Sequence, residues 1–540
     1  MHAHGGRLAV DVLQRHGVDV MFTLSGGHLF VVYDGAVQSG LRLVDTRHEQ
    51  TAAFAAEGWA KVTRRLGCAA LTAGPGVTNG VSAMTAAMMN GSPVVVVGGR
   101  APQGRWGSGS LQELDHVPIV ATVTKRASTA TSPASIVSEL HAACAAARTP
   151  HRGPAFVDIP LDAFGTDDVV FPDVDTAELR GSEPDSDALA RVTELVASAE
   201  RPVLFVGGDV YWAHAEDAMQ AFAEAAHVPV FVNGMGRGCI PADHELAFSR
   251  ARSVALKQAD VVIVAGTPLD FRLGFGRFGD AKVVHLVDAK TEVATHATVE
   301  TTVVGDLLRT FSALTEAGVA SDARGRHDAW ISRLRDHEHA TRASERDGLE
   351  AAASPIKPTR VYGELRRRLD RDAIVIGDGG DFVSYAGKFI DSYQPGTFLD
   401  PGPYGCLGMG PGYALAAALA HPDRQVVLLL GDGAIGFSLG DFDTLVRHGV
   451  RVTAIVGNNG IWGLEKHPMQ MLFGYDVVAD LRPGTRYDEV VAALGGNGEL
   501  VTEPTQIGPA LDRAFRSDGV HLVNVLTDPA DAYPRSSNLG

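Results

Sequence analysis

The chain has 540 residues, a formal net charge of −17 at pH 7 and 45% apolar residues. This length exceeds what one hydrophobic core usually supports, so we expect two or three domains, and the composition excludes a disordered or fibrous protein. Lysine and arginine form no cluster that would follow a nucleic-acid backbone, which argues against nucleic acid as a partner. The first residues carry no signal peptide and no apolar run would span a bilayer, so we expect a cytoplasmic protein without membrane contact.

Short apolar runs alternate with helical stretches along the whole chain, a pattern typical of βαβ units on parallel sheets. We therefore predict an α/β protein with three doubly wound parallel-sheet domains over residues 1–170, 186–325 and 355–540. Residues 167–187 are expected to form a linker, and the charged segment 321–350 either an exposed helix or a second linker. The expected strands lie at 18–24, 68–72, 93–98, 155–159, 203–207, 228–233, 261–265, 283–287, 373–376, 426–430, 452–456 and 520–525.

Two polar motifs follow neighbouring strands of the third domain. Gly431-Asp432-Gly433 comes directly after the strand expected at 426–430, and Asn458-Asn459 follows the next one. Each motif alone is also what a turn requires. Together they place a carboxylate and a carboxamide oxygen at one edge of a sheet, where a hard cation such as Mg²⁺ would bind with phosphate groups.

This pair of motifs resembles the signature of thiamine-diphosphate (ThDP) enzymes. The resemblance assigns the side chains of Asp432 and Asn459 and the carbonyl of Ile461 to Mg²⁺, and Gly431 and Gly433 to close approach of the diphosphate. It also implies names for the three domains: pyrimidine-binding, central nucleotide-binding and diphosphate-binding. The cofactors expected from it are ThDP and Mg²⁺.

Other segments are similar to further parts of ThDP enzymes. Glu49 matches the catalytic glutamate that holds a proton on the pyrimidine ring, with a helix N-terminal carboxylate as the alternative. Because Glu49 lies in the first domain and the metal clamp in the third, the resemblance implies that each site forms between two subunits of a homo-oligomer, with a tetramer expected. Leu407, with Gly405, matches the side chain that bends the cofactor, and Gly74, Pro75 and Asn79 match the loop that lines it.

The central domain resembles the nucleotide pocket of 2-hydroxyacyl-CoA lyases and oxalyl-CoA decarboxylases. Arg252 is the candidate phosphate contact and Arg272 a weaker one, with surface arginines as the alternative for both. ADP or coenzyme A is the ligand implied there, ahead of the FAD that acetolactate synthases hold in the same domain. Gln112 lies in a loop similar to that of the lyases, although acetolactate synthases have a related one.

We expect a ThDP-dependent carbon–carbon lyase that cleaves a 2-hydroxyacyl-CoA, such as 2-hydroxyisobutyryl-CoA, to formyl-CoA and an aldehyde or ketone. Three alternatives remain: an acetolactate synthase that condenses 2-keto acids, an oxalyl-CoA decarboxylase, and a non-catalytic nucleotide-binding regulator. Candidate bases are Glu499 first, then His28 and Gln112, with His116 and His467 as further candidates.

Overall fold

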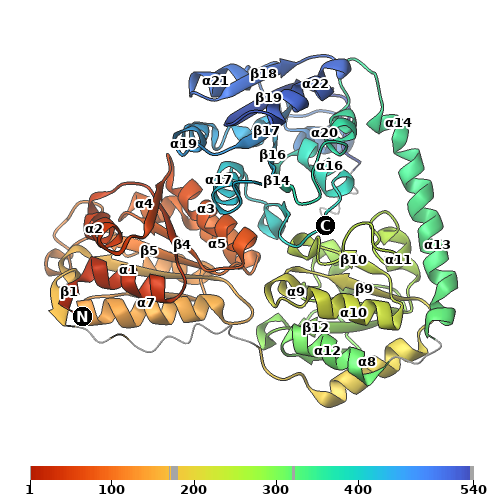
Figure 1. The fold of residues 1–540 in the computed structure, drawn as a ribbon, viewed down its shortest axis with the longest axis horizontal. Coiled ribbons are helices and arrows are strands. Elements are labelled where there is room, and N and C mark those ends of the chain that lie inside the picture. Colours follow the sequence, from red (N-terminus) through yellow and green to blue (C-terminus); the bar gives the residue numbers. More distant parts are fainter. Residues whose placement is uncertain (1, 169–170, 172–180, 319–322, 535–540) are drawn as a thin grey trace.

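The computed structural model describes residues 2–168, 171, 181–318 and 323–534. It contains three α/β domains, each a parallel sheet covered by helices on both faces, so the predicted fold class is confirmed (Figure 1). A two-stranded antiparallel pair, β1 (His2–His4) with β8 (Thr166–Asp168), joins the two ends of the first domain. No helix in these described ranges is long and apolar enough to cross a membrane.

The N-terminal domain has six parallel strands in the order β3-β2-β4-β5-β7-β6. Its central strands are buried on both faces, which explains their continuous runs of valine and alanine. The strands are β2 (Val20–Thr23), β3 (Arg42–Asp45), β4 (Gly67–Leu71), β5 (Val94–Arg100), β6 (Arg126–Thr129) and β7 (Pro154–Pro160). The helices are α1 (Gly5–Arg15), α2 (Phe30–Ser39), α3 (Glu49–Thr63), α4 (Pro75–Asn79), α5 (Val81–Met89), α6 (Val117–Val120) and α7 (Pro133–Arg148).

The central domain has a five-stranded parallel sheet in the order β10-β9-β11-β12-β13. The chain order reverses between β9 and β11, so their carboxyl ends form the crevice where such sheets bind ligands. The strands are β9 (Pro202–Val206), β10 (Val230–Val232), β11 (Val261–Ala265), β12 (Lys282–Val287) and β13 (Thr301–Val304). The helices are α8 (Ser186–Ser198), α9 (Gly208–Trp212), α10 (Glu216–Ala226), α11 (Arg252–Gln258) and α12 (Leu307–Ala317).

The C-terminal domain has six parallel strands in the order β15-β14-β16-β17-β19-β18. The strands are β14 (Ile374–Gly379), β15 (Phe398–Leu399), β16 (Val426–Gly431), β17 (Val452–Asn458), β18 (Asn497–Val501) and β19 (Val520–Leu526). The helices are α15 (Pro358–Leu365), α16 (Asp381–Phe389), α17 (Gly410–Ala420), α18 (Asp432–Ile435), α19 (Phe442–Arg447), α20 (Gly463–Phe473), α21 (Tyr487–Ala493) and α22 (Pro504–Phe515).

The segments between the domains differ in structure. Part of the first expected linker, 169–170 and 172–180, lies outside the described residues. The charged segment after the central domain is a helix, α13 (Ala323–Ser344), which runs along the outside of the molecule to the short α14 (Arg346–Leu349) (Figure 1). The helix alternative for this segment is therefore the correct one.

The first and third domains meet through helices α3 and α17. Glycines permit the close approach: a Cβ on Gly58 would come 2.8 Å from Tyr413 Cα, and one on Gly412 would come 2.8 Å from the Thr51 carbonyl oxygen. Buried side chains of both helices belong to one hydrophobic cluster that spans the two domains. This contact fixes the position of the first residue of α3, Glu49, relative to the C-terminal sheet.

Candidate active site

The carboxyl ends of strands β16 and β17 bring together the two motifs of the third domain. Asp432 is 4% exposed, and its carboxylate accepts hydrogen bonds from the amides of Gly433 (3.0 Å) and Gly460 (2.6 Å). The Asn459 side chain accepts from the Ile461 amide at 3.2 Å through Oδ1 and donates to Asp381 at 2.8 Å. A carboxylate and a carboxamide oxygen thus lie on adjacent loops at one edge of the sheet.

Burial sets the electrostatics of this edge. Removal from water raises the pKa of Asp432 to about 7, and the negative charge of Asp381 acts in the same direction. The pKa of Asp381 is raised as well, again by burial. Two carboxylates this poorly solvated favour a nearby cation, because a positive charge would hold both in the ionised form.

The loop that carries Leu407 is held by a buried carboxylate at the end of β14. Asp378 is 0% exposed and accepts from the amides of Gly408 and Gly410, both at 2.8 Å. Burial raises its pKa to about 7, which these hydrogen bonds oppose. Leu407 lies against the neighbouring backbone, since a Cβ on Gly379 would come 2.1 Å from its Cδ2.

In the first domain, Glu49 begins α3 directly after the loop that follows β3. Its Oε2 accepts a hydrogen bond from Asn79 Nδ2 at 3.1 Å, so the expected catalytic glutamate and the expected cofactor-lining loop are in contact. The next residue, Gln50, donates to the carbonyl of Leu407 at 3.3 Å. The N-terminus of α3 therefore touches the loop of Leu407 within one chain.

A chain of hydrogen bonds through His116 fixes the loop that starts at Gly74. The Gly74 amide donates to His116 Nε2 at 2.9 Å, so the proton of the neutral ring is on Nδ1, which faces Asp158 at 2.9 Å. Asp158 is also paired with Arg100 at 2.9 Å. Gln112, with a φ of 58°, packs beside the same glycine, because a Cβ on Gly74 would come 3.0 Å from the Gln112 Cβ.

His28 lies close to the residues that lead into this loop. It is 6% exposed, and its Nδ1 is 3.4 Å from Thr72 Oγ1. Burial lowers the pKa of His28, against a hydrogen bond with the Leu111 backbone, so the ring is neutral at neutral pH. The structure thus brings His28, Gln112, Gly74 and Glu49 to the carboxyl edge of the first sheet.

Comparison with known proteins identifies the family of the chain. Models of the thiamine pyrophosphate enzyme match all three parts: the N-terminal TPP binding domain over residues 3–119, the central domain over 189–314 and the C-terminal TPP binding domain over 378–525. The chain belongs to the thiamine pyrophosphate enzyme family. The predicted class, a ThDP enzyme, is confirmed.

Relatives of this ThDP enzyme fall into two groups. The probable acetolactate synthase of Mycobacterium bovis and the acetolactate synthase large subunit IlvG of Mycobacterium tuberculosis are each 56% identical over 540 residues, 99% of this chain and 98% of theirs. The human 2-hydroxyacyl-CoA lyase 2 is 33% identical over 553 residues, 93% of this chain and 86% of its own. The expected order, lyase before acetolactate synthase, is therefore not supported: the synthases are the more similar group.

The residues at the edge of the third sheet fit the diphosphate and metal of a ThDP enzyme. Asp432 and Asn459 present hard oxygen ligands of the kind that Mg²⁺ prefers. The glycines leave no room for a side chain, so the backbone itself forms this edge: a Cβ on Gly433 would come 2.4 Å from the Trp462 ring, and one on Gly431 would come 2.9 Å from the Gly379 carbonyl oxygen. A bulkier residue at either position would narrow the cradle.

The two arginines expected to bind a nucleotide in the central domain are placed differently from each other. Arg272 borders the crevice at the carboxyl ends of β9 and β11, although its guanidinium is paired with Asp270 at 2.7 Å. Arg252 does not line that crevice; it donates to the Arg272 carbonyl at 3.0 Å and lies 4.9 Å from the Phe205 ring centroid. Arg272 is thus the arginine that borders the crevice, while Arg252 contacts the backbone of its loop; both stay predictions as phosphate contacts.

Glu499 is not brought to the site within this chain. It lies in the middle of the edge strand β18, separated from β17 by β19, and accepts from Arg513 Nε of α22 at 3.0 Å. This ion pair ties an edge strand to its covering helix. His467 of α20 does lie near the metal-binding edge, where its charge lowers the pKa of Asp381 against the effect of burial.

Two carboxylates of the site, Asp378 and Asp381, were not predicted. Both lie in Gly377-Asp378-Gly379-Gly380-Asp381, at the end of β14 next to β16. A strand that ends in glycine and aspartate is the same signal that identified Asp432. It was available in the sequence at the start of the third domain.

Proposed function

We propose that the chain is an acetolactate synthase, which decarboxylates one 2-keto acid and joins the remaining carbons to a second. The observation that carries this proposal is the 56% identity to two acetolactate synthases over nearly the full length of both chains. Identity to the 2-hydroxyacyl-CoA lyases is 30–33%. We therefore place the lyase reaction second.

The C-terminal domain would hold the cofactor through its metal. Asp432, the Asn459 side chain and the Ile461 carbonyl would bind Mg²⁺, and the backbone at Gly431 and Gly433 would approach the diphosphate. Bound ThDP would supply the electron sink that the protein lacks, so that a carbon–carbon bond next to a carbonyl group can break or form. Leu407, held in place by Asp378, would support the bent conformation of the cofactor.

The N-terminal domain would supply the proton transfers. Glu49 would hold a proton on the pyrimidine ring nitrogen of the cofactor, with Asn79 orienting its carboxylate. Neutral His28 and Gln112, both close to the Gly74 loop, would contact the substrate carboxylate or carbonyl oxygen. Glu499 has no part in this proposal, because Arg513 holds it on the edge strand.

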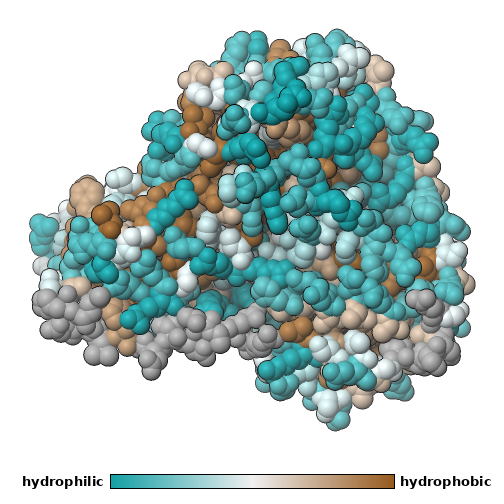
Figure 2. Space-filling view, viewed as in Figure 1, coloured by the Kyte–Doolittle hydropathy of each residue, from teal (hydrophilic) through white to brown (hydrophobic). Residues whose placement is uncertain are grey.

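We propose that two copies assemble so that Glu49 of one chain completes the metal site of the other, and that such dimers pair into tetramers. Apolar side chains gather along the junction of the first and third domains, which Figure 2 shows as a continuous brown region. Exposed apolar patches of this kind mark interfaces. Large exposed apolar residues of these two domains include Phe30 (62%), Met89 (56%), Leu111 (79%), Phe437 (62%), Met471 (71%) and Phe473 (64%).

The crevice between β9 and β11 is the proposed nucleotide site. It is lined by Gly208, Asn233, Gly266, Thr267 and Arg272, a set with backbone amides and one guanidinium suited to phosphate groups. FAD would accompany the synthase reaction, and ADP or coenzyme A the lyase reaction. The absorption spectrum of the purified protein separates the two, because only FAD is yellow.

Turnover of two substrates tests the function directly. The protein is given ThDP and Mg²⁺ with either pyruvate or 2-hydroxyisobutyryl-CoA, and we expect acetolactate from pyruvate. Formyl-CoA from the thioester without acetolactate from pyruvate would contradict the proposal and favour the lyase. Carbon dioxide from oxalyl-CoA alone would favour the decarboxylase, and no turnover of any substrate the non-catalytic regulator. Glu49→Gln serves as the control, since it removes the proposed proton carrier with little change in shape.

A further inference from the structure

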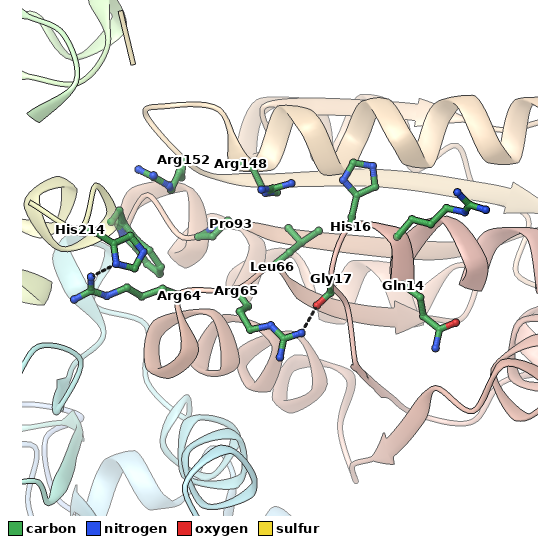
Figure 3. A pocket seen from close by; sticks show the side chains of 12 residues that line it. Gln14, His16, Gly17, Arg64, Arg65, Leu66, Pro93, Arg148, Arg152 and His214 are labelled. Carbon is green, nitrogen blue, oxygen red and sulfur yellow. Dashed lines mark hydrogen bonds between the residues drawn. The ribbon is translucent and has the colours of Figure 1, made fainter. Parts of the chain in front are cut away.

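A pocket of about 480 Å³ lies between the N-terminal and central domains, away from the cofactor site (Figure 3). Its wall includes Leu66 and Pro93, which directly precede β4 and β5. These are the amino ends of the strands of the first sheet. Glu49 and Gly74 follow β3 and β4 at the carboxyl ends, so the pocket is on the opposite edge of the same sheet.

The wall of this pocket is strongly basic. Of its twelve lining residues, five are arginines and two are histidines, and within the described part of the chain none is acidic. The whole chain carries a net charge of −17, so a pocket of this sign is the opposite of what its composition would place there by chance. The arginines are Arg15, Arg64, Arg65, Arg148 and Arg152.

Helix ends explain only part of this charge. Helices α1 and α7 end at Arg15 and Arg148, and Arg64 caps α3, so each arginine stabilises a helix C-terminus by about 0.3–1 kcal/mol. Stabilising a helix C-terminus requires only one cation at each helix. It does not explain why the C-terminal ends of three helices lie at one cavity. Arg65 and Arg152 lie beyond their helices and add to the same wall.

Two of these arginines are held in place by carboxylates that lie outside the pocket wall. Arg64 is paired with Glu216 at 2.7 Å, and Arg65 with Asp19 at 2.5 Å, and neither carboxylate belongs to the pocket wall. An arginine has five N–H groups, so one that pairs with a carboxylate on one side can still face an anion with the others. Such pairing fixes the geometry of the wall before a ligand arrives.

Two buried rings of the wall support an anionic ligand. Trp212 is 2% exposed, and its indole N–H makes no hydrogen bond to any described residue, so it is a buried donor without an acceptor. His16 is 7% exposed, and its pKa is lowered to about 4 by burial and by the positive potential of His141 and Arg148. An anion would accept a hydrogen bond from the Trp212 indole and would offset the positive potential at His16.

We propose that this pocket binds a chain of two or three phosphate groups, either free or as part of a nucleotide. The volume lies within the range of about 300–1,000 Å³ that small-molecule sites occupy. Figure 3 shows the basic side chains spread along the pocket, from Arg152 and His214 at one end past Arg148 and Arg65 toward His16. Guanidinium groups arranged in a row fit an extended polyanion, since each planar fork matches one phosphate.

Arg152 connects this pocket to the central domain. Its Nη1 lies 3.9 Å from Asp288, which follows β12, and the neighbouring His151 is hydrogen-bonded to Asp209 at 2.9 Å. His151 and Asp209 line the crevice between β9 and β11. A phosphate chain bound to Arg152 would therefore lie next to His151, a residue that also forms the wall of the nucleotide crevice.

Isothermal titration of the enzyme saturated with ThDP and Mg²⁺ tests the site, with tripolyphosphate and ATP as separate probes. We expect tripolyphosphate to bind the parent and the double variant Arg65→Gln/Arg148→Gln to bind it at least tenfold more weakly. Arg516→Gln, at an exposed arginine of the C-terminal domain, should bind like the parent. ATP binding that is at least tenfold tighter than tripolyphosphate and is weakened in the same double variant identifies a nucleotide at this pocket, and equal affinities identify inorganic polyphosphate.

The variant Arg65→Lys/Arg148→Lys keeps both charges and guards against a folding defect. It should retain binding within a few-fold of the parent, and thermal unfolding checks that both double variants are folded. The proposal is overturned if tripolyphosphate does not bind the parent at millimolar concentration. It is also overturned if Arg65→Gln/Arg148→Gln is folded and binds as tightly as Arg516→Gln.

Discussion

The substitution Lys61→Met removes a buried ion pair in the helix that begins with Glu49, together with a hydrogen bond of 2.9 Å from Nζ to the Tyr413 hydroxyl. Lys61 is 1% exposed and Glu57 0% exposed, with 3.1 Å between Nζ and Oε1. The same Oε1 accepts from Asn90 at 2.8 Å and Ser92 at 3.1 Å, whereas Oε2 makes no hydrogen bond among the described residues. Lys61 is the cation that compensates this carboxylate, and methionine would fill its volume without its charge.

Removal of one partner leaves a buried charge, which costs about 3–5 kcal/mol. The neutral donors Asn90 and Ser92 do not replace the ammonium group of Lys61, so we expect a loss of stability of about 3–5 kcal/mol. Hydrogen exchange followed by mass spectrometry on the peptide Glu49–Thr63 measures the opening of α3. A loss of 3–5 kcal/mol corresponds to exchange roughly 100- to 5,000-fold faster.

The double variant Glu57→Gln/Lys61→Met removes both charges and retains the acceptor for Asn90 and Ser92. It should return to within about 1 kcal/mol of the parent, because a buried pair replaced by neutral groups is often neutral in stability. Lys257→Met, at an exposed lysine, is the matched control. If Lys61→Met slows or leaves unchanged the exchange of α3, the pair does not stabilise this helix and the reasoning is wrong.

Three further substitutions probe the site and the domain interface. Asp378→Ala leaves the buried amides of Gly408 and Gly410 unpaired, at about 1–3 kcal/mol each, and the displaced Leu407 loop should lower kcat about 100-fold; an unchanged kcat would refute this role. Gly433→Ala directs a Cβ to within 2.4 Å of Trp462, so ThDP should bind at least tenfold more weakly in a titration with Mg²⁺, about 1–3 kcal/mol of overpacking. Burial disfavours the charged form of His151, but Asp209 raises the pKa of this histidine to about 9. Because this value exceeds the unfolded value of about 6.5, the His151–Asp209 pair contributes its full stability below pH 6.5, and this stability is lost as the pH rises through 9. His151→Gln should flatten the dependence of Tm on pH between 6.5 and 9.5, and a parallel dependence in the variant would contradict the assignment.

The interior strands of each sheet could be predicted from the sequence because both of their faces are buried. Runs such as Val94–Val97 and Val426–Leu430 are apolar throughout, and this is the pattern that helices on both faces impose. The edge strands β6 and β18 gave no such signal: β6 is half-buried along its length and β18 is mostly exposed or half-buried. Their residues alternate too weakly over four or five positions to be distinguished from loops.

The site was predictable where it depends on motifs and not where it depends on packing. Asp432 and Asn459 follow strands in recognisable pairs, so their proximity followed from the parallel sheet. The different positions of Arg252 and Arg272 could not be read from the sequence, because they depend on which of two nearby guanidinium groups packs against the loop. Glu499 was chosen for its carboxylate, and its pairing with Arg513 depends on the register of α22 against β18.

The glycine contacts between α3 and α17 have a consequence for how such a protein can be recombined. The opposing backbone lies so close to Gly58 and Gly412 that a larger residue at either of these two positions would force the two domains apart. A chimera that takes its first domain from one relative and its third from another would have to match both surfaces at once. The central domain packs against both outer domains as well, since Tyr211 donates to the Lys61 carbonyl at the end of α3 and Arg237 to the Gly387 carbonyl of the third domain. An exchanged central domain would therefore have to keep these contacts for the paired outer domains to stay intact.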